Sequence, residues 1–171
     1  MIIEGKEKKI LNDALGELRK NTGLVVDIVE FEGRELNAEY YHDAKVKIQW
    51  NDLDYYFVVE IKNIVTRAIL GVAIKQLNLF QQKGMLVAKY INPRIADELK
   101  KMDVPFIDAV GNAYINETPL FIYIKGNKPT DKNILEQPAR IFRPTGLQVI
   151  FVLLCNPGLE NKPYRDIAIK A

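Results

Sequence analysis

The sequence has little of three things: cysteine, long apolar runs and net charge. Its single cysteine, Cys155, excludes an internal disulfide, and because it lies in an apolar helical stretch we expect an inert, buried thiol. The longest apolar runs, such as residues 147–155, are far shorter than a membrane span, and residues 1–9 lack the apolar stretch of a secretory signal. We therefore expect a cytoplasmic protein without a membrane-spanning segment.

The formal net charge of +2 is too small to indicate a nucleic-acid partner by itself. Its distribution is uneven, because residues 1–124 carry 16 basic against 18 acidic side chains, whereas residues 125–171 carry 8 against 4. A solvated basic face explains this C-terminal excess equally well. At 171 residues and 48% hydrophobic composition, the chain is long enough for one substantial core with a small second unit attached.

The apolar spacing predicts an α/β fold. Helical or alternating patterns predict helices over residues 3–20, 66–82 and 93–101, and strands over residues 24–31, 43–50, 55–62, 85–91, 104–107 and 120–125. The first three strands follow one another through short connections, which favours an antiparallel meander. The strand, helix and strand from residue 85 to 107 predict a βαβ element that covers one edge of the sheet.

A polar segment divides the chain. Polar residues dominate from 126 to 139, so we expect a domain over 1–125, a linker over 126–139 and a separate segment over 140–171. In that last segment Pro144 suits a helix start, Asn156-Pro157-Gly158 ends the helix, and Pro163 starts a shorter one.

A short acidic and basic motif ends the third predicted strand. Glu60 and Lys62 lie two positions apart, so their side chains share one face roughly 7 Å apart, while Ile61 points into the core. A carboxylate and an ammonium at the end of the buried run 55–59 are costly unless they pair or bind something. A simple salt bridge is the ordinary explanation of an isolated Glu-x-Lys.

Asp43 adds a second carboxylate. It stands at the start of the preceding strand, and an antiparallel connection would bring its carboxylate beside that of Glu60. Asp43 and Glu60 could then hold Mg²⁺ or Mn²⁺, which keeps waters and binds a substrate phosphate. Lys62 could orient or help to deprotonate the attacking water, and hydrolysis of a phosphodiester would follow.

A leading helix, three strands with Asp43 on the second and Glu60-Ile61-Lys62 on the third, then a helix and a strand, resembles the PD-(D/E)xK superfamily of restriction and resolvase-type nucleases. The resemblance covers roughly residues 3–108. It implies a restriction-endonuclease-like fold, in which a mixed sheet is flanked by helices and Asp43, Glu60 and Lys62 form the catalytic centre.

The same resemblance implies two further site residues. A glutamate on the first helix often completes the metal site, and Glu7 matches it; an exposed helix charge is the alternative. A polar residue on the second helix often faces the site, and Gln76 fits, with a buried hydrogen-bonded amide as the alternative. The proline expected before the aspartate is His42 here. That histidine could assist a metal-bound water or serve only a structural role.

A second resemblance concerns residues 104–115 (VPFIDAVGNAYI), 142–161 (FRPTGLQVIFVLLCNPGLEN) and 163–168 (PYRDIA). They resemble bacterial AbiEi-family antitoxins of type IV toxin-antitoxin systems. This implies a DNA-binding transcriptional regulator in which a nuclease-like domain is joined to a winged helix-turn-helix, with a cognate toxin as partner; a homodimer stays open.

The two C-terminal helices match only the first helices of such a module, since its recognition helix would follow Ala171. We therefore expect the natural chain to continue. Arg140 and Arg143 could contact DNA phosphates, or could be ordinary surface charges. Three functions remain: a DNA-binding regulator or antitoxin, a Mg²⁺-dependent DNA endonuclease, and an interaction module in which Asp43, Glu60 and Lys62 form a buried salt-bridge cluster.

Overall fold

The computed structural model describes residues 5–33, 41–130 and 144–170. The chain divides into two compact units, Met1–Thr130 (unit 1) and Asp131–Ala171 (unit 2). The division falls inside the segment 126–139 that the sequence predicts as a linker. Each unit is described by itself.

Unit 1 is built on one seven-stranded mixed sheet, in which the strands lie side by side in chain order from β1 to β7. The neighbours β1, β2 and β3 are antiparallel, β3, β4 and β5 are parallel, and β5, β6 and β7 are antiparallel. The strands are β1 (Val25–Gly33), β2 (His42–Trp50), β3 (Leu53–Lys62), β4 (Gly84–Ala88), β5 (Phe106–Asp108), β6 (Ala113–Glu117) and β7 (Leu120–Ile124).

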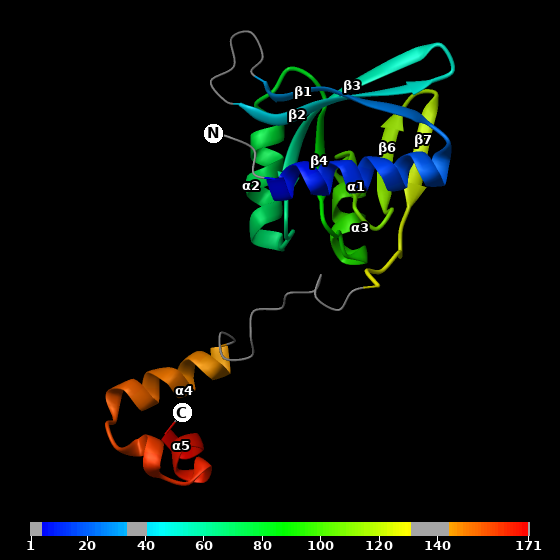
Figure 1. Ribbon diagram of the computed structural model, residues 1–171. Coiled ribbons are helices and arrows are strands. Elements are labelled where there is room, and N and C mark those ends of the chain that lie inside the picture. The colour runs from blue at the N-terminus through cyan, green and yellow to red at the C-terminus, as the bar shows by residue number, and fades with distance from the viewer. Residues whose placement is uncertain (1–4, 34–40, 131–143, 171) are drawn as a thin grey trace. The chain divides into compact units, whose positions relative to one another are not determined.

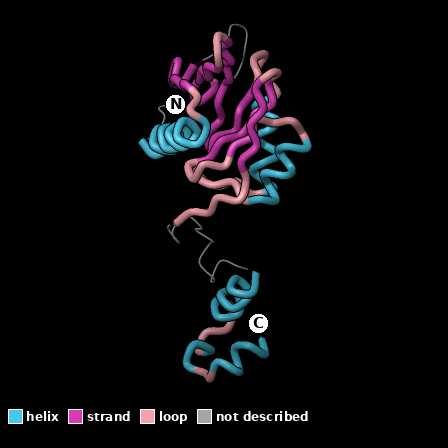
Figure 2. The backbone as a smooth tube through the Cα atoms, turned by 90° about the vertical axis from the view of Figure 1, so that its right-hand side faces the viewer, coloured by secondary structure: helices cyan, strands magenta, loops and turns pink. Residues whose placement is uncertain are grey.

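Helices cover both faces of the sheet. Helix α1 (Gly5–Thr22) lies across one face (Figure 1), and α2 (Arg67–Leu77) and α3 (Pro93–Lys101) lie on the other, as the turned view makes plain (Figure 2). Each face has its own apolar core, which we call the α1-side core and the α2/α3-side core. The predicted α/β class, with a mixed sheet flanked by helices, is therefore confirmed.

Helix α1 carries one continuous apolar stripe. Its buried side chains are Ile10, Leu11, Ala14, Leu15 and Leu18, which recur at helical spacing and belong to the α1-side core. The helix ends at Thr22 and is followed by Gly23, whose φ of 73° is left-handed and whose N–H donates to the Arg19 carbonyl at 2.8 Å. Glycine adopts this conformation without the steric cost of a Cβ.

Helix α2 is shorter than the predicted span 66–82. Thr66 caps its start, accepting from the Ile69 N–H at 3.4 Å, and Asn78 caps its end. The helix stops at Leu77 because β4 begins seven residues later and packs closely: a Cβ at Gly84 would lie 2.7 Å from Cβ of Leu77. The intervening residues are needed to cross from the helix layer to the sheet.

Helix α3 begins and ends where the sequence predicts. The side chain of Asn92 accepts hydrogen bonds from the N–H groups of Arg94 (3.0 Å) and Ile95 (3.1 Å), and Pro93 occupies the first helical position. These local signals define the N-terminus without help from the rest of the fold.

The prediction that β4 and β5 lie at a sheet edge is wrong. Strand β6, which the sequence patterns did not predict, pairs with β5, and β7 pairs with β6. The β6–β7 hairpin therefore extends the sheet, and β4 and β5 lie inside it. Strand β6 buries Ala113, Tyr114 and Ile115 in succession, so it lacks the alternation of a half-exposed strand.

Unit 2 consists of α4 (Pro144–Cys155), a 3₁₀ turn η3 (Leu159–Asn161) and α5 (Tyr164–Lys170). The predicted helix start at Pro144 and the break at 156–158 are confirmed. Leu147, Phe151 and Leu154 share one face of α4 and are 49%, 67% and 77% exposed. Cys155 is also exposed within unit 2, so the expected burial of its thiol is wrong.

No described helix combines the length and the apolar character needed to cross a membrane.

Candidate active site

Strands β2 and β3 separate just beyond Ala44 and Val59, the last residues that their ladder pairs. Two residues further along β3, the Ile61 N–H donates to Oδ2 of Asp43 at 2.6 Å. The carboxylate of Asp43 thus takes a backbone donor that a continued ladder would give to a carbonyl. The separation lets a side chain of β2 reach the end of β3.

Glu60 and Lys62 lie on the sheet face that α2 and α3 cover. Their neighbour Ile61 belongs to the α1-side core, whereas Glu60 is aligned with Leu86 of β4, which belongs to the α2/α3-side core. Glu60 is 5% exposed and forms an ion pair with Lys62. We call Asp43, Glu60 and Lys62 the carboxylate–lysine site.

The two carboxyl groups are electrostatically unfavourable as they stand. Burial raises the pKa of Asp43, against the opposing effects of the Ile61 hydrogen bond and the Lys62 charge. Burial also raises the pKa of Glu60, and the charge of Asp43 raises it further, although the Lys62 hydrogen bond opposes both. A pair of carboxyl groups in which burial raises both pKa values, and the charge of one raises the pKa of the other, is a place where a cation is stabilising.

The donor set is compatible with Mg²⁺ or Mn²⁺, since both prefer carboxylate oxygens and Mg²⁺ is held in proteins by one or two carboxylates while keeping several waters. No group of three or more His, Cys, Asp or Glu side chains able to hold a metal ion occurs among the described residues. A metal would therefore depend on Asp43 and Glu60, with waters or substrate oxygens as its other ligands.

The two other residues that the nuclease resemblance implies differ in their placement. Glu7, half-exposed in the first turn of α1, lies close enough for its charge to raise the pKa of Glu60. Gln76 is half-buried on α2, where its main-chain carbonyl accepts from the Leu79 N–H at 3.0 Å. In the part of the chain that the structure describes, its amide is not a hydrogen-bond partner of Asp43 or Glu60.

His42 is packed into the structure. Its side chain is almost fully buried, its ring meets Phe80 edge-on with centroids 5.9 Å apart, and Nε2 lies 3.4 Å from Oε1 of Glu30. Its ring leaves no room for a Cβ at Gly33. These contacts favour the structural role for His42 over assistance to a metal-bound water.

Arg140 and Arg143 lie outside the described residues, so their contacts stay a prediction.

Sequence reasoning missed a second buried carboxylate, Asp108, which lies at the end of β5. Its oxygens accept four hydrogen bonds: from the N–H of Ile91 (2.8 Å), from the N–H of Val110 (3.1 Å), and from both the N–H and the side-chain amide of Asn112 (2.8 Å each). Burial raises the pKa of Asp108, and the four donors oppose that shift. The segment Asp-Ala-Val-Gly-Asn could have signalled a turn built on its aspartate.

The second missed feature is a hollow between α3 and β7, lined by Asp97, Lys100, Lys101, Tyr123 and Lys125. The lining residues come from α3 and from the end of β7 with the residue that follows it, which are distant in sequence, and only the fold brings them together.

Comparisons with protein-family models, with curated proteins and with solved structures return no match to this chain. What defines the chain is its own architecture: an α/β unit with a seven-stranded mixed sheet between helices, and a carboxylate–lysine site where β2 and β3 part.

Proposed function

We propose that this protein acts on DNA, and that the carboxylate–lysine site of unit 1 is a divalent-metal site for phosphodiester hydrolysis. The observation that carries the proposal is the meeting of Asp43 and Glu60, from two separating strands, beside Lys62. Each carboxyl group has a raised pKa, and the charge of Asp43 contributes to the shift at Glu60. Perturbed ionisable groups of this kind concentrate at functional sites.

The chemistry follows from what each side chain offers. A bound Mg²⁺ or Mn²⁺ would supply Lewis-acid polarisation of a phosphoryl oxygen and a water of lowered pKa. Asp43 and Glu60 would hold the cation, and the Ile61 N–H keeps the Asp43 carboxylate in place. Lys62, whose ammonium pairs with Glu60, would orient the attacking water and neutralise charge on the phosphate.

DNA is proposed as the substrate on three grounds. The order of elements and the Asp, Glu-x-Lys pattern resemble the PD-(D/E)xK nucleases. The basic excess lies in residues 125–171. Helices α4 and α5 of unit 2, joined by a short connection, are similar to the opening helices of a winged helix-turn-helix.

A second function, a DNA-binding regulator or antitoxin that does not cleave, is favoured by a different observation. Without a metal, Glu60 already pairs with Lys62 and Asp43 already accepts from Ile61. Because both carboxylates already have protein partners, the site is compatible with a nuclease-like unit that contacts DNA or a toxin without cleaving DNA.

The deciding experiment incubates single-stranded and duplex DNA with the protein and Mg²⁺, Mn²⁺ or EDTA. Asp43→Asn, Glu60→Gln and Lys62→Met are compared with the wild type. Glu98→Gln is the matched control, because Glu98 is a half-buried carboxylate in an ion pair with Arg67, on the surface of α3.

Metal-dependent cleavage that falls at least a hundredfold in the three site variants and persists in Glu98→Gln supports hydrolysis at this site. DNA binding without cleavage in any metal supports the regulator. Cleavage that survives in Glu60→Gln and Asp43→Asn refutes the carboxylate–lysine site as its source.

A further inference from the structure

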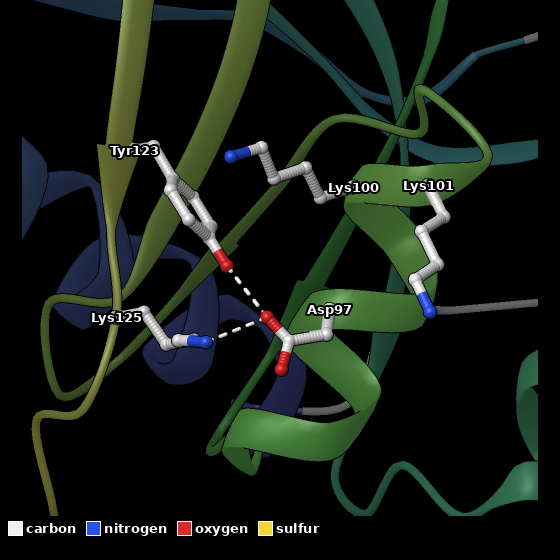
Figure 3. Close-up of a pocket in the computed structure, with 5 residues that line it drawn as sticks. All are labelled: Asp97, Lys100, Lys101, Tyr123 and Lys125. Atoms are coloured by element: carbon white, nitrogen blue, oxygen red, sulfur yellow. Dashed lines mark hydrogen bonds and ion pairs between the residues drawn. The ribbon is translucent and has the colours of Figure 1, made fainter.

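The hollow between α3 and β7 has a volume of about 560 Å³ and opens at the edge of the sheet (Figure 3). We call it the α3–β7 groove. It is lined by three lysines and a tyrosine with one carboxylate, so its lining carries a positive charge. It is distinct from the carboxylate–lysine site, because β7 is four strands from β3, or about 19 Å at the usual strand spacing.

Asp97 uses its charge inside the groove. One of its carboxylate oxygens accepts from the Lys125 ammonium at 2.6 Å and from the Tyr123 hydroxyl at 2.9 Å, as the dashed lines of Figure 3 mark. These hydrogen bonds lower the pKa of Asp97, so the group is ionised at neutral pH. Asp97 therefore compensates Lys125 and fixes the Tyr123 ring.

Lys100 and Lys101 form no ion pair with a carboxylate in the described part of the chain. The Lys100 ammonium lies 3.9 Å from the centroid of the Tyr123 ring. This cation–π contact positions the ammonium beside the groove and leaves its charge uncompensated by a carboxylate. Lys101 is exposed at the end of α3 and lines the same hollow. Two cations beside an open hollow are suited to bind an anion such as a phosphate.

A further aromatic ring is exposed on β7, beyond the residues that line the groove. Phe121 lies two residues before Tyr123 on the same face of the strand, about 7 Å away, and is 60% exposed. Its ring meets Tyr114 edge-on at 6.2 Å, which supports one side of the ring and leaves the other to solvent. Exposed aromatic rings next to cations are the usual way in which proteins bind unpaired nucleic-acid strands, since every base has a face that can stack.

We propose that the α3–β7 groove binds single-stranded DNA, with backbone phosphates at Lys100 and Lys101 and a base stacked on Phe121. The inference rests on the proposed action on DNA, and it adds a strand-binding surface away from the proposed reaction centre. An acidic peptide would use the lysines but not Phe121, and duplex DNA keeps its bases stacked within the helix. The contribution of Phe121 thus separates a single strand from the two other ligands.

The test is equilibrium binding in EDTA, by fluorescence anisotropy, of a labelled 20-nucleotide single strand and the corresponding duplex over a range of salt concentrations. Phe121→Ala removes the stacking ring and Phe121→Trp retains one. Lys100→Gln/Lys101→Gln removes both cations. Lys20→Gln is the matched control, because Lys20 is an exposed lysine on α1, which covers the other face of the sheet.

We expect Phe121→Ala to weaken single-strand binding by about tenfold or more, and to change duplex binding far less. Phe121→Trp should bind like the wild type, and its added indole should be quenched by the strand beyond the response of Trp50, the only native tryptophan. The double lysine variant should lower the single-strand salt slope by about 1.4, at 0.7 for each phosphate contact. Lys20→Gln should leave the slope unchanged.

Single-strand binding that is equal in the wild type, in Phe121→Ala and in the double lysine variant overturns the inference, and so does an equal loss of single-strand and duplex binding in Phe121→Ala. The inference is also overturned if a short acidic peptide displaces the labelled single strand as well as an unlabelled single strand does. Because EDTA removes any metal, these outcomes do not depend on cleavage. Cleavage at the carboxylate–lysine site can therefore fail while the groove binds, or succeed while it does not.

Discussion

Unit 1 has carboxylates that are wholly or partly buried in two places, and the two places differ in how many donors each carboxylate meets. Asp108 is fully buried and accepts four hydrogen bonds from three residues. At the carboxylate–lysine site, Asp43 accepts from one backbone N–H, that of Ile61, and Glu60 pairs with one lysine, Lys62. Burial raises the pKa at both places, but only at the second does one carboxylate of the pair, Asp43, also raise the pKa of the other, Glu60.

The difference separates a structural carboxylate from one suited to bind something. At Asp108 the donors come from the β4–α3 connection (Ile91) and from the β5–β6 turn (Val110, Asn112), so the carboxylate ties two connections together. Nothing more is needed to stabilise it. At the carboxylate–lysine site the negative charge exceeds the positive charge next to it, and a divalent cation would reverse that imbalance.

Breaking the structural carboxylate should have the largest effect. In Asp108→Asn one acceptor oxygen becomes an NH₂ that faces N–H donors, so the unfolding free energy should fall by about 3 kcal/mol, as when a buried, charge-assisted network loses partners. Chemical denaturation followed by circular dichroism measures it. Asp103→Asn is the control, since Asp103 is an exposed aspartate with two side-chain donors, Tyr114 and Asn116; there the loss should stay below about 1 kcal/mol. Equal losses in the two variants would contradict the comparison.

Metal binding should act at the carboxylate–lysine site alone. Mg²⁺ or Mn²⁺ at a hundred times its dissociation constant should stabilise the wild type by about 2.7 kcal/mol, because only the folded state holds both ligands. Asp43→Asn and Glu60→Gln should lose this gain, whereas Asp103→Asn should keep it. Thermal unfolding in EDTA and in metal measures the difference. Stabilisation that persists in both site variants would place the metal elsewhere.

The pH dependence of the metal-free protein sharpens the same contrast. Since the folded-state pKa values of Asp43 and Glu60 lie above the ordinary 3.8 and 4.5, the folded state binds more protons than the unfolded state in that window. Stability should therefore fall as the pH rises from the ordinary values through the raised ones, and then level off.

Asp108 contributes with the same sign, so the informative quantity is the difference between the wild type and Asp43→Asn/Glu60→Gln. In urea denaturation between pH 3.5 and 8, the unfolding free energy of the double variant should fall less steeply with rising pH than that of the wild type. The difference between the two should be smaller than the stabilisation by metal. A steeper fall would mean that the site carboxylates are stabilised in their ionised form.

Local patterns predicted the parts of the fold that local contacts decide. The stripe of α1, the proline at the start of α3, and the separation of Ile61 from Glu60 and Lys62 onto opposite faces are properties of residues a few positions apart. The order of the first three strands followed from their short connections. The geometry of the Glu60–Lys62 pair could therefore be predicted, but its purpose could not.

Features that depend on distant partners were not predictable in this way. The Asp108 carboxylate accepts from the Ile91 N–H, 17 residues away, in a sheet where β4 and β5 are paired. Strand β6 is fixed by its neighbours β5 and β7 and not by its own alternation. The exposure of Cys155 depends on what covers α4, which the apolar pattern of that helix does not specify.

The smallest expected effect concerns Glu7, and it tests how far the carboxylate–lysine site extends. The charge of Glu7 contributes to the raised pKa of Glu60, but Glu7 is half-exposed, so solvent screens the interaction. Glu7→Gln should change the unfolding free energy by less than about 0.5 kcal/mol. It should also lower the pKa of Glu60, which carboxyl-detected NMR measures directly. Glu17→Gln, on the same helix but paired with Lys20, should leave that pKa unchanged. If Glu7→Gln shifts Glu60 and weakens Mg²⁺ binding, Glu7 belongs to the cation's surroundings; if it shifts neither, the site ends at Asp43, Glu60 and Lys62.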